Sequence, residues 1–398
     1  MKSCRITNSS ICAVWKKNQN NFLRGLREME NITTAGSLSQ VKTRVAAIDE
    51  ARANLKTRSW FFAVLIIAVV AVFVAELTFG AVTIPLSAII KSLVGVEIER
   101  QTWTRILFDL RLPRALTALF AGAALGVSGL LTQTLFRNPL ASPWTLGMAA
   151  GGEFGVAAIV VLAGATTTNF FGAYDIAANI GLAAAASIGS TAVLLFILAI
   201  SRRVSTVTLL VVGLMTQYLV EGFVSLLLHF TEEAQTSVFS GWDDASFAKI
   251  TWNQVGILIP VVVVGLVISF TLVKPLNALL LGENYARTLG LTVGKARLLA
   301  FGCLAILAGA VTAYCGPVVF LGIAVPHLCR GLFNTSDHRT LVPATVLMGS
   351  LLALSADLVT HLAWGRHIFH LNTVNALIGA PVVLWVILRK KNLRGLDL

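Results

Sequence analysis

Residues 276–297 read LNALLLGENYARTLGLTVGKAR and form a polar segment inside an otherwise strongly apolar chain. The charged residues Glu283, Arg287, Lys295 and Arg297 stand among leucines and alanines that recur at roughly helical spacing. This pattern predicts one or two short amphipathic helices rather than a membrane span. Because long hydrophobic runs flank the segment, we expect a cytoplasmic loop that presents its helices to a partner. The alternative is a helix that rests on the lipid headgroups.

The composition of the whole chain indicates a membrane protein. Hydrophobic residues make up 56% of the sequence, charged residues 13%, and the mean hydropathy is +0.80. A bilayer core about 30 Å thick requires about 20 helical residues per span. We therefore expect an all-α polytopic membrane protein whose ten spans lie at roughly 60–80, 113–135, 144–163, 176–200, 207–230, 254–273, 298–315, 317–333, 343–363 and 373–389.

Residues 1–57 form a separate basic and polar zone ahead of the first predicted span. Up to Arg58 this zone holds eleven Lys and Arg residues against four acids. It lacks the apolar core and cleavage site of a signal peptide. We expect a poorly ordered cytoplasmic extension, a membrane domain at 58–391 and a cytoplasmic tail at 392–398. No nucleic-acid partner is expected, because no aromatic pattern accompanies the charge.

The charges of the loops favour cytoplasmic termini. The polar segment 276–297 and residues 389–391 are basic, whereas the expected outer loops at 232–233 and 243–244 are acidic. One outer loop is an exception. Between the first two spans it contains Lys91, Arg100, Arg105, Arg111 and Arg114. Basic residues on this side of the membrane are expected to have a function there.

The sequence contains no catalytic or metal-binding motif. There is no GxxxxGK[ST] phosphate loop, no HExxH and no nucleophile elbow, so we expect neither an ATPase site nor a catalytic residue. The five cysteines lack the spacing of a zinc site. His361, His367 and His370 lie close in sequence, but on an irregular turn they are weak candidates for metal ligands. We expect no metal and no cofactor on this chain.

Four blocks of sequence, in a constant order, together produce a family resemblance. They are RLPR at Arg111 followed by AGAALGVSGLLTQTLFRNPLASPWTLG ending at Gly147, LGENYARTLGLTVGKARLLA from Leu281, GPVVFLGIAVPHLCRGLF from Gly316, and ALIGAP from Ala376. In this order and spacing they resemble the FecCD-type permeases of binding-protein-dependent ABC importers for iron–siderophore complexes, haem and cobalamin. The resemblance covers about residues 60–391.

The resemblance implies the type II ABC importer permease fold, with ten transmembrane helices per subunit, in the bacterial inner membrane. It implies a homodimer, two cytoplasmic ABC ATPase subunits that use ATP and Mg²⁺, and a periplasmic or lipid-anchored substrate-binding protein. A ferric siderophore is the expected cargo, with haem or cobalamin as alternatives. The rival class is an ion-gradient-driven secondary transporter, in which Glu153 and Glu221 would be proton or cation sites.

The polar segment matches the ATPase-coupling loop of this family, between spans six and seven. The resemblance places the coupling role on Leu281, Gly282, Glu283, Ala286, Leu289 and Gly290. Glycine at positions 282 and 290 allows turns and the close approach of a partner surface. The alternative is that Gly282 and Gly290 only terminate helices, which would place glycine at the same positions.

The outer arginines match positions that dock the binding protein in this family. Arg111 and Arg114 would pair with glutamates on its two lobes, and salt would weaken this attraction. Arginines that snorkel at a helix start are the alternative. Where cobalamin-type members have an arginine at the outer end of span nine, this chain has His361, followed by Arg366. We expect Arg111, Arg114, His361 and Arg366 to form the surface that docks the binding protein, and this surface differs from that of cobalamin-type members.

Two carboxyl groups lie inside predicted spans. Glu153 occupies span three, and Glu221 lies in span five, one turn beyond Gln217. An ionisable group in a span is costly unless it faces a polar cavity or a partner, so these three residues are candidates for the translocation path. A carboxyl that is protonated or paired within the bundle is the alternative. Ser205 and Thr206 match the turn that narrows the cytoplasmic exit in relatives, although a helix cap would look the same.

Overall fold

The computed structural model describes residues 57–94, 100–166, 176–201, 203–204, 206–362 and 369–389. All regular elements in these ranges are helical, which confirms the predicted fold class. The chain divides into two compact units, Met1–Phe61 and Phe62–Leu398. Only the first residues of the helix Thr57–Thr78 are described in the first unit, so the architecture below is that of the second.

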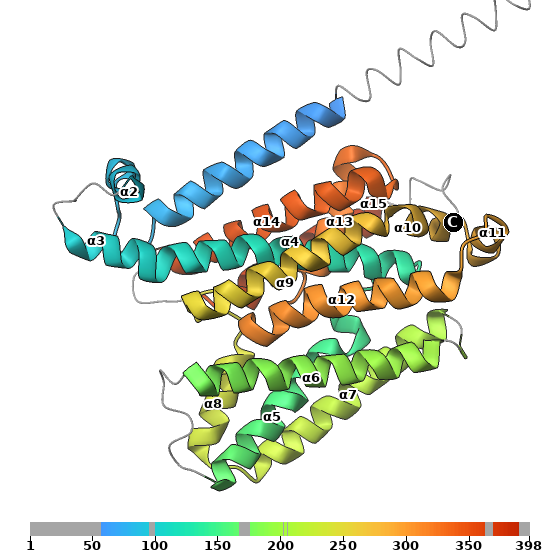
Figure 1. Cartoon of the computed structure of the whole chain (residues 1–398), viewed down its shortest axis with the longest axis horizontal. Coiled ribbons are helices and arrows are strands. Elements are labelled where there is room, and N and C mark those ends of the chain that lie inside the picture. Colours follow the sequence, from blue (N-terminus) through green and yellow to red (C-terminus); the bar gives the residue numbers. More distant parts are fainter. Residues whose placement is uncertain are drawn as a thin grey trace, which may run out of the picture. The chain divides into compact units, whose positions relative to one another are not determined.

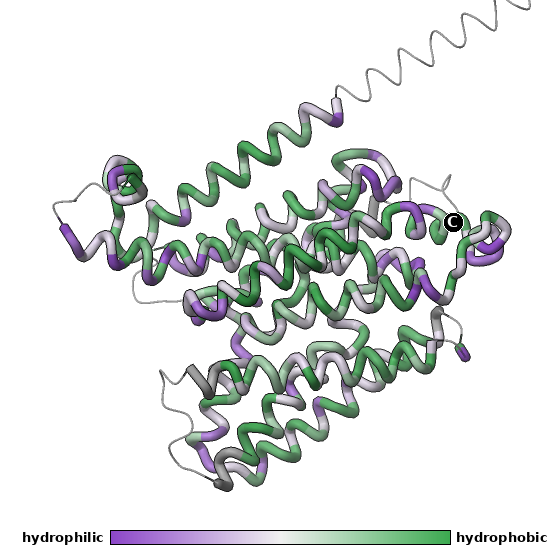
Figure 2. The backbone as a smooth tube through the Cα atoms, viewed as in Figure 1, coloured by the Kyte–Doolittle hydropathy of each residue, from purple (hydrophilic) through white to green (hydrophobic). Residues whose placement is uncertain are grey.

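The helices of the second unit follow the apolar runs of the sequence. After the helix Thr57–Thr78 come α2 (Leu86–Leu93), α3 (Gln101–Arg105), the π-helical turn η1 (Ile106–Arg111), α4 (Leu112–Leu135), the 3₁₀ turn η2 (Trp144–Leu146), α5 (Met148–Thr166), α6 (Ile176–Ser201), α7 (Thr206–His229), α8 (Glu233–Asp243), α9 (Trp252–Thr271), α10 (Val273–Leu280), α11 (Glu283–Thr288), α12 (Val293–Cys315), α13 (Leu321–Phe333), α14 (His338–His361) and α15 (Leu371–Arg389). Apolar residues dominate the long helices, and hydrophilic residues gather near their ends (Figure 2).

Each predicted span coincides with a helix, but the helices differ in length. Among the described residues, seven helices are long and apolar enough to cross a membrane. The predicted spans at 144–163, 317–333 and 373–389 correspond to α5, α13 and α15, whose described apolar parts are shorter. The count of ten membrane spans therefore stays a prediction.

The long helices pack in two groups (Figure 1). In the larger group α4 is central and contacts α9, α12, α13 and α14. The second group consists of α5, α6, α7 and α8, and it joins the first where α12 packs against α6. Every residue of α4 from Ala121 to Leu135 is buried, which makes this helix the core of the membrane domain.

Glycines allow α4 to approach α13 and α14 closely. A Cβ atom at Gly122 would lie 2.2 Å from the carbonyl oxygen of Gly349 in α14, and one at Gly129 would lie 1.9 Å from that of Gly322 in α13. Neither position has room for a side chain. Within a bilayer the hydrophobic effect does not drive helices together, so close backbone packing of this kind is a main source of their association.

A second glycine seam orients α5 against α6. A Cβ atom at Gly155 would lie 2.1 Å from the carbonyl oxygen of Ala185, and one at Gly189 would lie 1.9 Å from that of Gly151. Successive residues of a helix are about 100° apart around its axis. Glu153 is two residues from both seam glycines of α5, Gly151 and Gly155, and so lies on the opposite side of the helix, toward the charges of Glu221 on α7 and Asp243 on α8.

The predicted turn at Gly316–Pro317 is confirmed. α12 ends at Cys315 and α13 begins at Leu321. Gly316 adopts a φ of 75°, and a Cβ atom there would lie 2.5 Å from the carbonyl oxygen of Trp242. Only glycine combines this left-handed backbone with so close an approach.

We predict that Gly129→Ala destabilises the protein, because the added methyl group overlaps the backbone of α13. A loss of about 2 kcal/mol is expected for this degree of overpacking. Gly302→Ala in α12 is the matched control, since a Cβ atom there meets nothing within 4 Å. Thermal unfolding midpoints in one detergent would be compared, and equal midpoints for the two variants would contradict the prediction.

Candidate functional site

The polar segment forms two short helices, α10 and α11, as predicted. Gly282 precedes α11 with a φ of 116°, and Gly290 follows it with a φ of 81°. Both glycines therefore make the turns expected of them, because side-chain-bearing residues rarely adopt these backbone angles. Ala286 is completely buried and fastens the inner side of α11 to the protein.

Three exposed apolar side chains lie in and beside α11. Tyr285 belongs to the helix and is 52% exposed, whereas Leu281, the C-cap of α10, and Leu289, the C-cap of α11, are 66% and 60% exposed. We call these three residues the α11 face. Clustered apolar side chains of this size on a polar loop are typical of a surface that binds a partner.

An ion pair connects α11 to the start of α12. The carboxylate of Glu283 accepts a hydrogen bond from the Arg297 guanidinium, and Arg287 lies 4.0 Å from its other oxygen. Glu283 thus has its partner, Arg297, within the chain, and the ion pair links α11 mechanically to the long helix α12.

A second set of contacts connects α10 to α14. The Asn277 side-chain nitrogen donates to Asp337 Oδ1 at 2.6 Å, and its oxygen accepts from the backbone N–H of His338 at 2.9 Å. Asp337 also caps α14 by accepting from the backbone N–H of Arg339. Partial burial opposes ionisation, but these hydrogen bonds and the neighbouring positive charges hold the pKa of Asp337 below its ordinary value.

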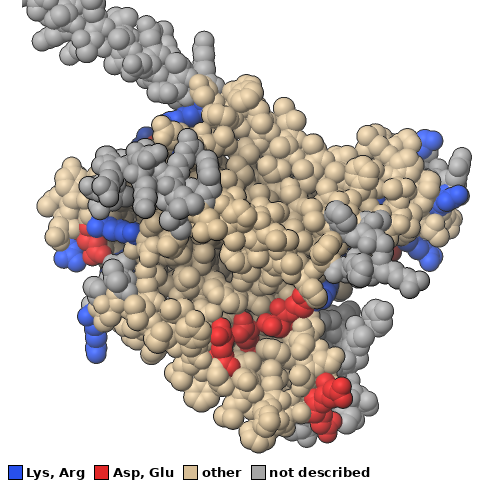
Figure 3. Space-filling view, turned by 180° about the vertical axis from the view of Figure 1, so that it is seen from behind, with Lys and Arg blue, Asp and Glu red and all other residues tan. Residues whose placement is uncertain are grey.

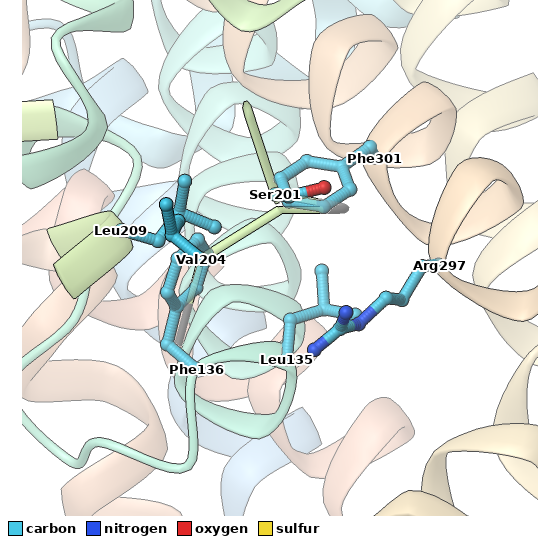
Figure 4. Close-up of a pocket in the computed structure, with 7 residues that line it drawn as sticks. All are labelled: Leu135, Phe136, Ser201, Val204, Leu209, Arg297 and Phe301. Carbon is cyan, nitrogen blue, oxygen red and sulfur yellow. The ribbon is translucent and has the colours of Figure 1, made fainter. Parts of the chain in front are cut away.

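A small pocket lies behind Arg297, between helices of both groups (Figure 4). Its lining residues are Leu135, Phe136, Ser201, Val204, Leu209, Arg297 and Phe301. The rings of Phe136 and Phe301 meet edge to face, with centroids 6.1 Å apart. The pocket therefore adjoins both the start of α12 and the connection from α6 to α7.

The predicted gate falls on that connection. Ser205 lies outside the described residues, and Thr206 is the first residue of α7, with its side chain outside the description. Their gating role stays a prediction. Nevertheless, their neighbours Val204 and Leu209 line the same pocket as Arg297.

Arg111 anchors the end of the helix Thr57–Thr78. The π-helical turn η1 ends at this residue and directs it inward, where it is 8% exposed. Its guanidinium donates to the carbonyl oxygens of Leu77 at 2.7 Å and Thr78 at 3.0 Å, and also to that of Val82. A cation at the carbonyl end of a helix also interacts favourably with the helix dipole.

Arg114 forms a two-pronged ion pair with Asp357 of α14. Its Nε atom donates to Asp357 Oδ2 at 2.7 Å and its Nη2 atom to Oδ1 at 2.8 Å. Nη2 also donates to the hydroxyl of Thr360 at 2.9 Å. Because Asp357 is almost fully buried, the main role of the Arg114–Asp357 pair is to hold α4 and α14 together.

Glu76 and His361 complete the charged network at this end. His361 Nδ1 lies 2.7 Å from the carbonyl oxygen of Asp357, to which it can only donate. Its other nitrogen, Nε2, lies 3.4 Å from Glu76 Oε1. Without a proton, His361 Nε2 and Glu76 Oε1 are both hydrogen-bond acceptors. Their contact is therefore attractive only when one of the two atoms carries a proton and donates it to the other.

This network contains the one group of potential metal ligands found among the described residues. Ligand atoms of Glu76, Asp357 and His361 lie within 4.8 Å of one another. However, both oxygens of Asp357 accept from Arg114, and Arg114 Nε is 3.9 Å from Glu76 Oε1. Two guanidinium groups beside two carboxylates leave little charge to attract a cation, so the arrangement fits an ion-pair network better than a metal centre.

Arg111 and Arg114 therefore have partners inside the chain that the sequence did not indicate. The signal for Glu76 was available, because it is an acid at the end of an apolar run. Arg366 lies outside the described residues. Docking of a binding protein by Arg111, Arg114, His361 and Arg366 stays a prediction.

The candidate residues of the translocation path come together where α5, α7 and α8 meet. The Gln217 side-chain nitrogen donates to Glu221 Oε1 at 2.9 Å. Glu153 is 8% exposed and lies within electrostatic range of both Glu221 and Asp243. The contribution of Asp243 was not foreseen, because its loop position gave no reason to place it beside two spans.

We predict that Asp357→Asn strongly destabilises the protein, because it leaves Arg114 charged and poorly compensated. Breaking one partner of a buried pair costs about 3–5 kcal/mol. Arg287→Gln removes only a loose, exposed pair with Glu283, for which a change below about 1 kcal/mol is expected. Unfolding midpoints of the two variants in the same detergent test this, and similar midpoints would refute a structural role for the buried pair.

Comparisons with known proteins agree with this architecture. The sequence profile of the FecCD transport family matches residues 66–389. The hemin transport system permease HmuU of Yersinia pestis is 32% identical over 316 residues, covering 78% of this chain and 91% of the relative. The vitamin B12 import system permease BtuC of Citrobacter koseri is 32% identical over 285 residues, covering 71% and 83%. A solved inward-facing metal-chelate type ABC transporter superposes with a TM-score of 0.72 at 25% identity, covering 83% of this chain and 99% of that one.

Proposed function

The chain belongs to the FecCD transport family, as a membrane permease subunit of an ABC importer, and from this premise we propose that it moves a ferric siderophore or related iron chelate into the cytoplasm. The observation that carries the mechanism is the exposed α11 face, held on the polar loop between α9 and α12. A carrier driven by an ion gradient has no need of such a surface, so the family assignment and the loop both favour ATP-driven import. Haem and cobalamin are the alternative cargoes, since relatives of those names match the chain.

We propose that a cytoplasmic ABC ATPase binds the α11 face. The ATPase supplies the site for ATP and Mg²⁺, and this chain supplies the surface on which its movement acts. Glu283 passes that movement to Arg297 at the start of α12. The pocket behind Arg297 then connects it to the α6–α7 junction, where Ser205 and Thr206 would open and close the cytoplasmic exit.

The proposed assembly contains two copies of the chain, two ATPases and one substrate-binding protein. α7 has a long exposed apolar side suited to a second copy, formed by Val211, Leu214, Met215, Tyr218, Leu219, Phe223 and Leu226. The binding protein would dock at the outer end, near Arg111, Arg114, His361 and Arg366. Exposed Lys91, Arg100 and Arg105 add positive charge there. Both termini would lie in the cytoplasm of a bacterial cell.

The cargo is tested by measuring uptake of labelled ferric chelates, haem and cobalamin in cells with and without the chain. We expect deletion to abolish uptake of a ferric chelate and to leave haem and cobalamin uptake unchanged. Loss of haem or cobalamin uptake alone would change the cargo and keep the mechanism. Unchanged uptake of all three, in cells that lack other importers for them, would contradict the proposed function.

The coupling surface is tested by the double substitution Leu281→Ser with Leu289→Ser. Each leucine contributes apolar area at the centre of the proposed interface, so we expect ATP-driven uptake to fall by about tenfold or more, together with loss of ATPase co-purification. Leu195→Ser is the control, because it removes an equally exposed leucine from α6. Variants are compared at equal membrane abundance. Full co-purification of the ATPase with the double variant would rule out the α11 face as its binding surface.

A further inference from the structure

Three carboxyl groups are carried by helices that pack together, since α5 contacts both α7 and α8. They belong to Glu153, Glu221 and Asp243, and we call them the acidic junction. The charge of Glu153 interacts with those of both partners, and Asp243 interacts with Glu221. Figure 3 shows acidic side chains gathered in a row on one face of the molecule. Burial and the charges of Asp244 and Glu221 raise the pKa of Asp243, as expected where like charges are held together.

The nearby basic groups are engaged elsewhere. Lys249 donates to the carbonyl oxygens of Gly241 and Asp244, both at 2.6 Å, and lies 3.8 Å from Asp244 Oδ2. His370 Nδ1 lies 2.8 Å from Asp244 Oδ1. Asp244 thus holds both basic side chains, although Lys249 still offsets part of the charge of Asp243 at longer range. Within the described part of the chain, no member of the acidic junction forms an ion pair.

Gln217 is an independent sign that the acidic junction accommodates a ligand. This residue is 5% exposed, and its side-chain nitrogen donates to Glu221. The oxygen of the same amide group is buried and has no hydrogen-bond donor among the described residues. Buried acceptors are normally paired with a donor. The acidic junction and Gln217 together therefore offer acceptors to a group that donates hydrogen bonds and bears positive charge.

The spacing of the carboxylates argues against a bare metal ion. Among the described residues, the three ligand atoms that lie within 4.8 Å of one another belong to the network of Glu76, and the acidic junction is more open. A small cation requires several oxygen atoms in its first coordination sphere. A larger solute with an ammonium group, which has three N–H donors, suits the wider arrangement better.

Building on the proposed function, we propose that the acidic junction is a substrate-contacting site on the translocation path that favours cationic metal chelates over anionic ones. Its members Glu153 on α5 and Glu221 on α7 are two of the residues predicted from the sequence for the path, so a solute that passes them meets negative charge. A low-dielectric wall strengthens such a field. Chelates with free ammonium groups would be attracted, whereas tris-catecholate chelates and haem, with its carboxylates, would be repelled.

The charge of the acidic junction is tested by cysteine modification in the full-length chain with its partner ATPase. Ser225→Cys places a thiol at an exposed position one turn beyond Glu221. Its rates of reaction with a trimethylammonium and a sulfonate methanethiosulfonate reagent are compared, with the chain that retains Ser225 as background. We expect the cationic reagent to react about tenfold faster once each rate is divided by the rate of the same reagent with a small free thiol in solution.

This preference should disappear when Glu153→Gln, Glu221→Gln and Asp243→Asn are added together. Glu233→Gln, which removes an exposed acid of α8 outside the acidic junction, should leave it unchanged. Equal normalised rates for the two reagents, or a normalised preference that survives the triple substitution, would overturn the proposal. This measurement does not depend on transport, so it remains decisive even if the chain imports a different cargo.

A second measurement asks whether the preference reaches the cargo. Cells take up a ferric trihydroxamate that has a free amine, or its N-acetylated form, which differs only in charge. The triple substitution should lower uptake of the amine form relative to the acetylated form by about tenfold, while Glu233→Gln should not. An unchanged ratio refutes the role in selectivity. If deleting the chain affects neither chelate, the proposed function fails for this cargo, and the reagent rates alone decide the charge of the site.

Discussion

The close contact of α4 with α13 and α14 is the constraint on which the remaining architecture depends. Carbonyl oxygens of α13 and α14 occupy the space that side chains at Gly122 and Gly129 would need. In a bilayer, helices gain little from hiding apolar surface, so packing at this distance supplies much of their association. With α4 held in the centre, Arg114 near its N-terminal end reaches Asp357 of α14. The C-terminal end of the same helix contributes Leu135 to the pocket beside Arg297.

Charged residues at the two ends of the molecule have different relations to the fold. The arginines of the RLPR motif hold helices together: Arg111 donates to backbone carbonyls, and Arg114 is paired with acids of the chain. On the polar loop, Glu283 and Arg297 are also paired, but the neighbouring leucines are left exposed. A membrane permease that is moved by a separate ATPase needs such a combination. The loop must be firmly attached to the core, and its partner surface must be free.

The acidic junction gives the second helix group a role distinct from that of the first. The glycine seam between α5 and α6 leaves Glu153 on the side of α5 that faces α7 and α8. Packing of small residues on one side of a helix thereby determines which polar residues meet on the other. On α7 the buried side chain of Gln217 donates to Glu221, and its oxygen has no hydrogen-bond partner among the described residues.

Much of this protein could be predicted from its sequence, because apolar run length and helical period are local properties. They located the membrane helices, the turn at Gly316 and the two short helices of the polar segment, and motif order indicated the family. Sequence also identified Glu153 and Glu221 as unusual, since an acid in an apolar run is visible without a structure. The tertiary structure alone decided which groups meet: Arg111 with the carbonyls of Leu77 and Thr78, Arg114 with Asp357, and Asp243 with the two acids of the spans. Such pairings join residues far apart in the chain, and they depend on how closely helix backbones approach, which no local pattern encodes.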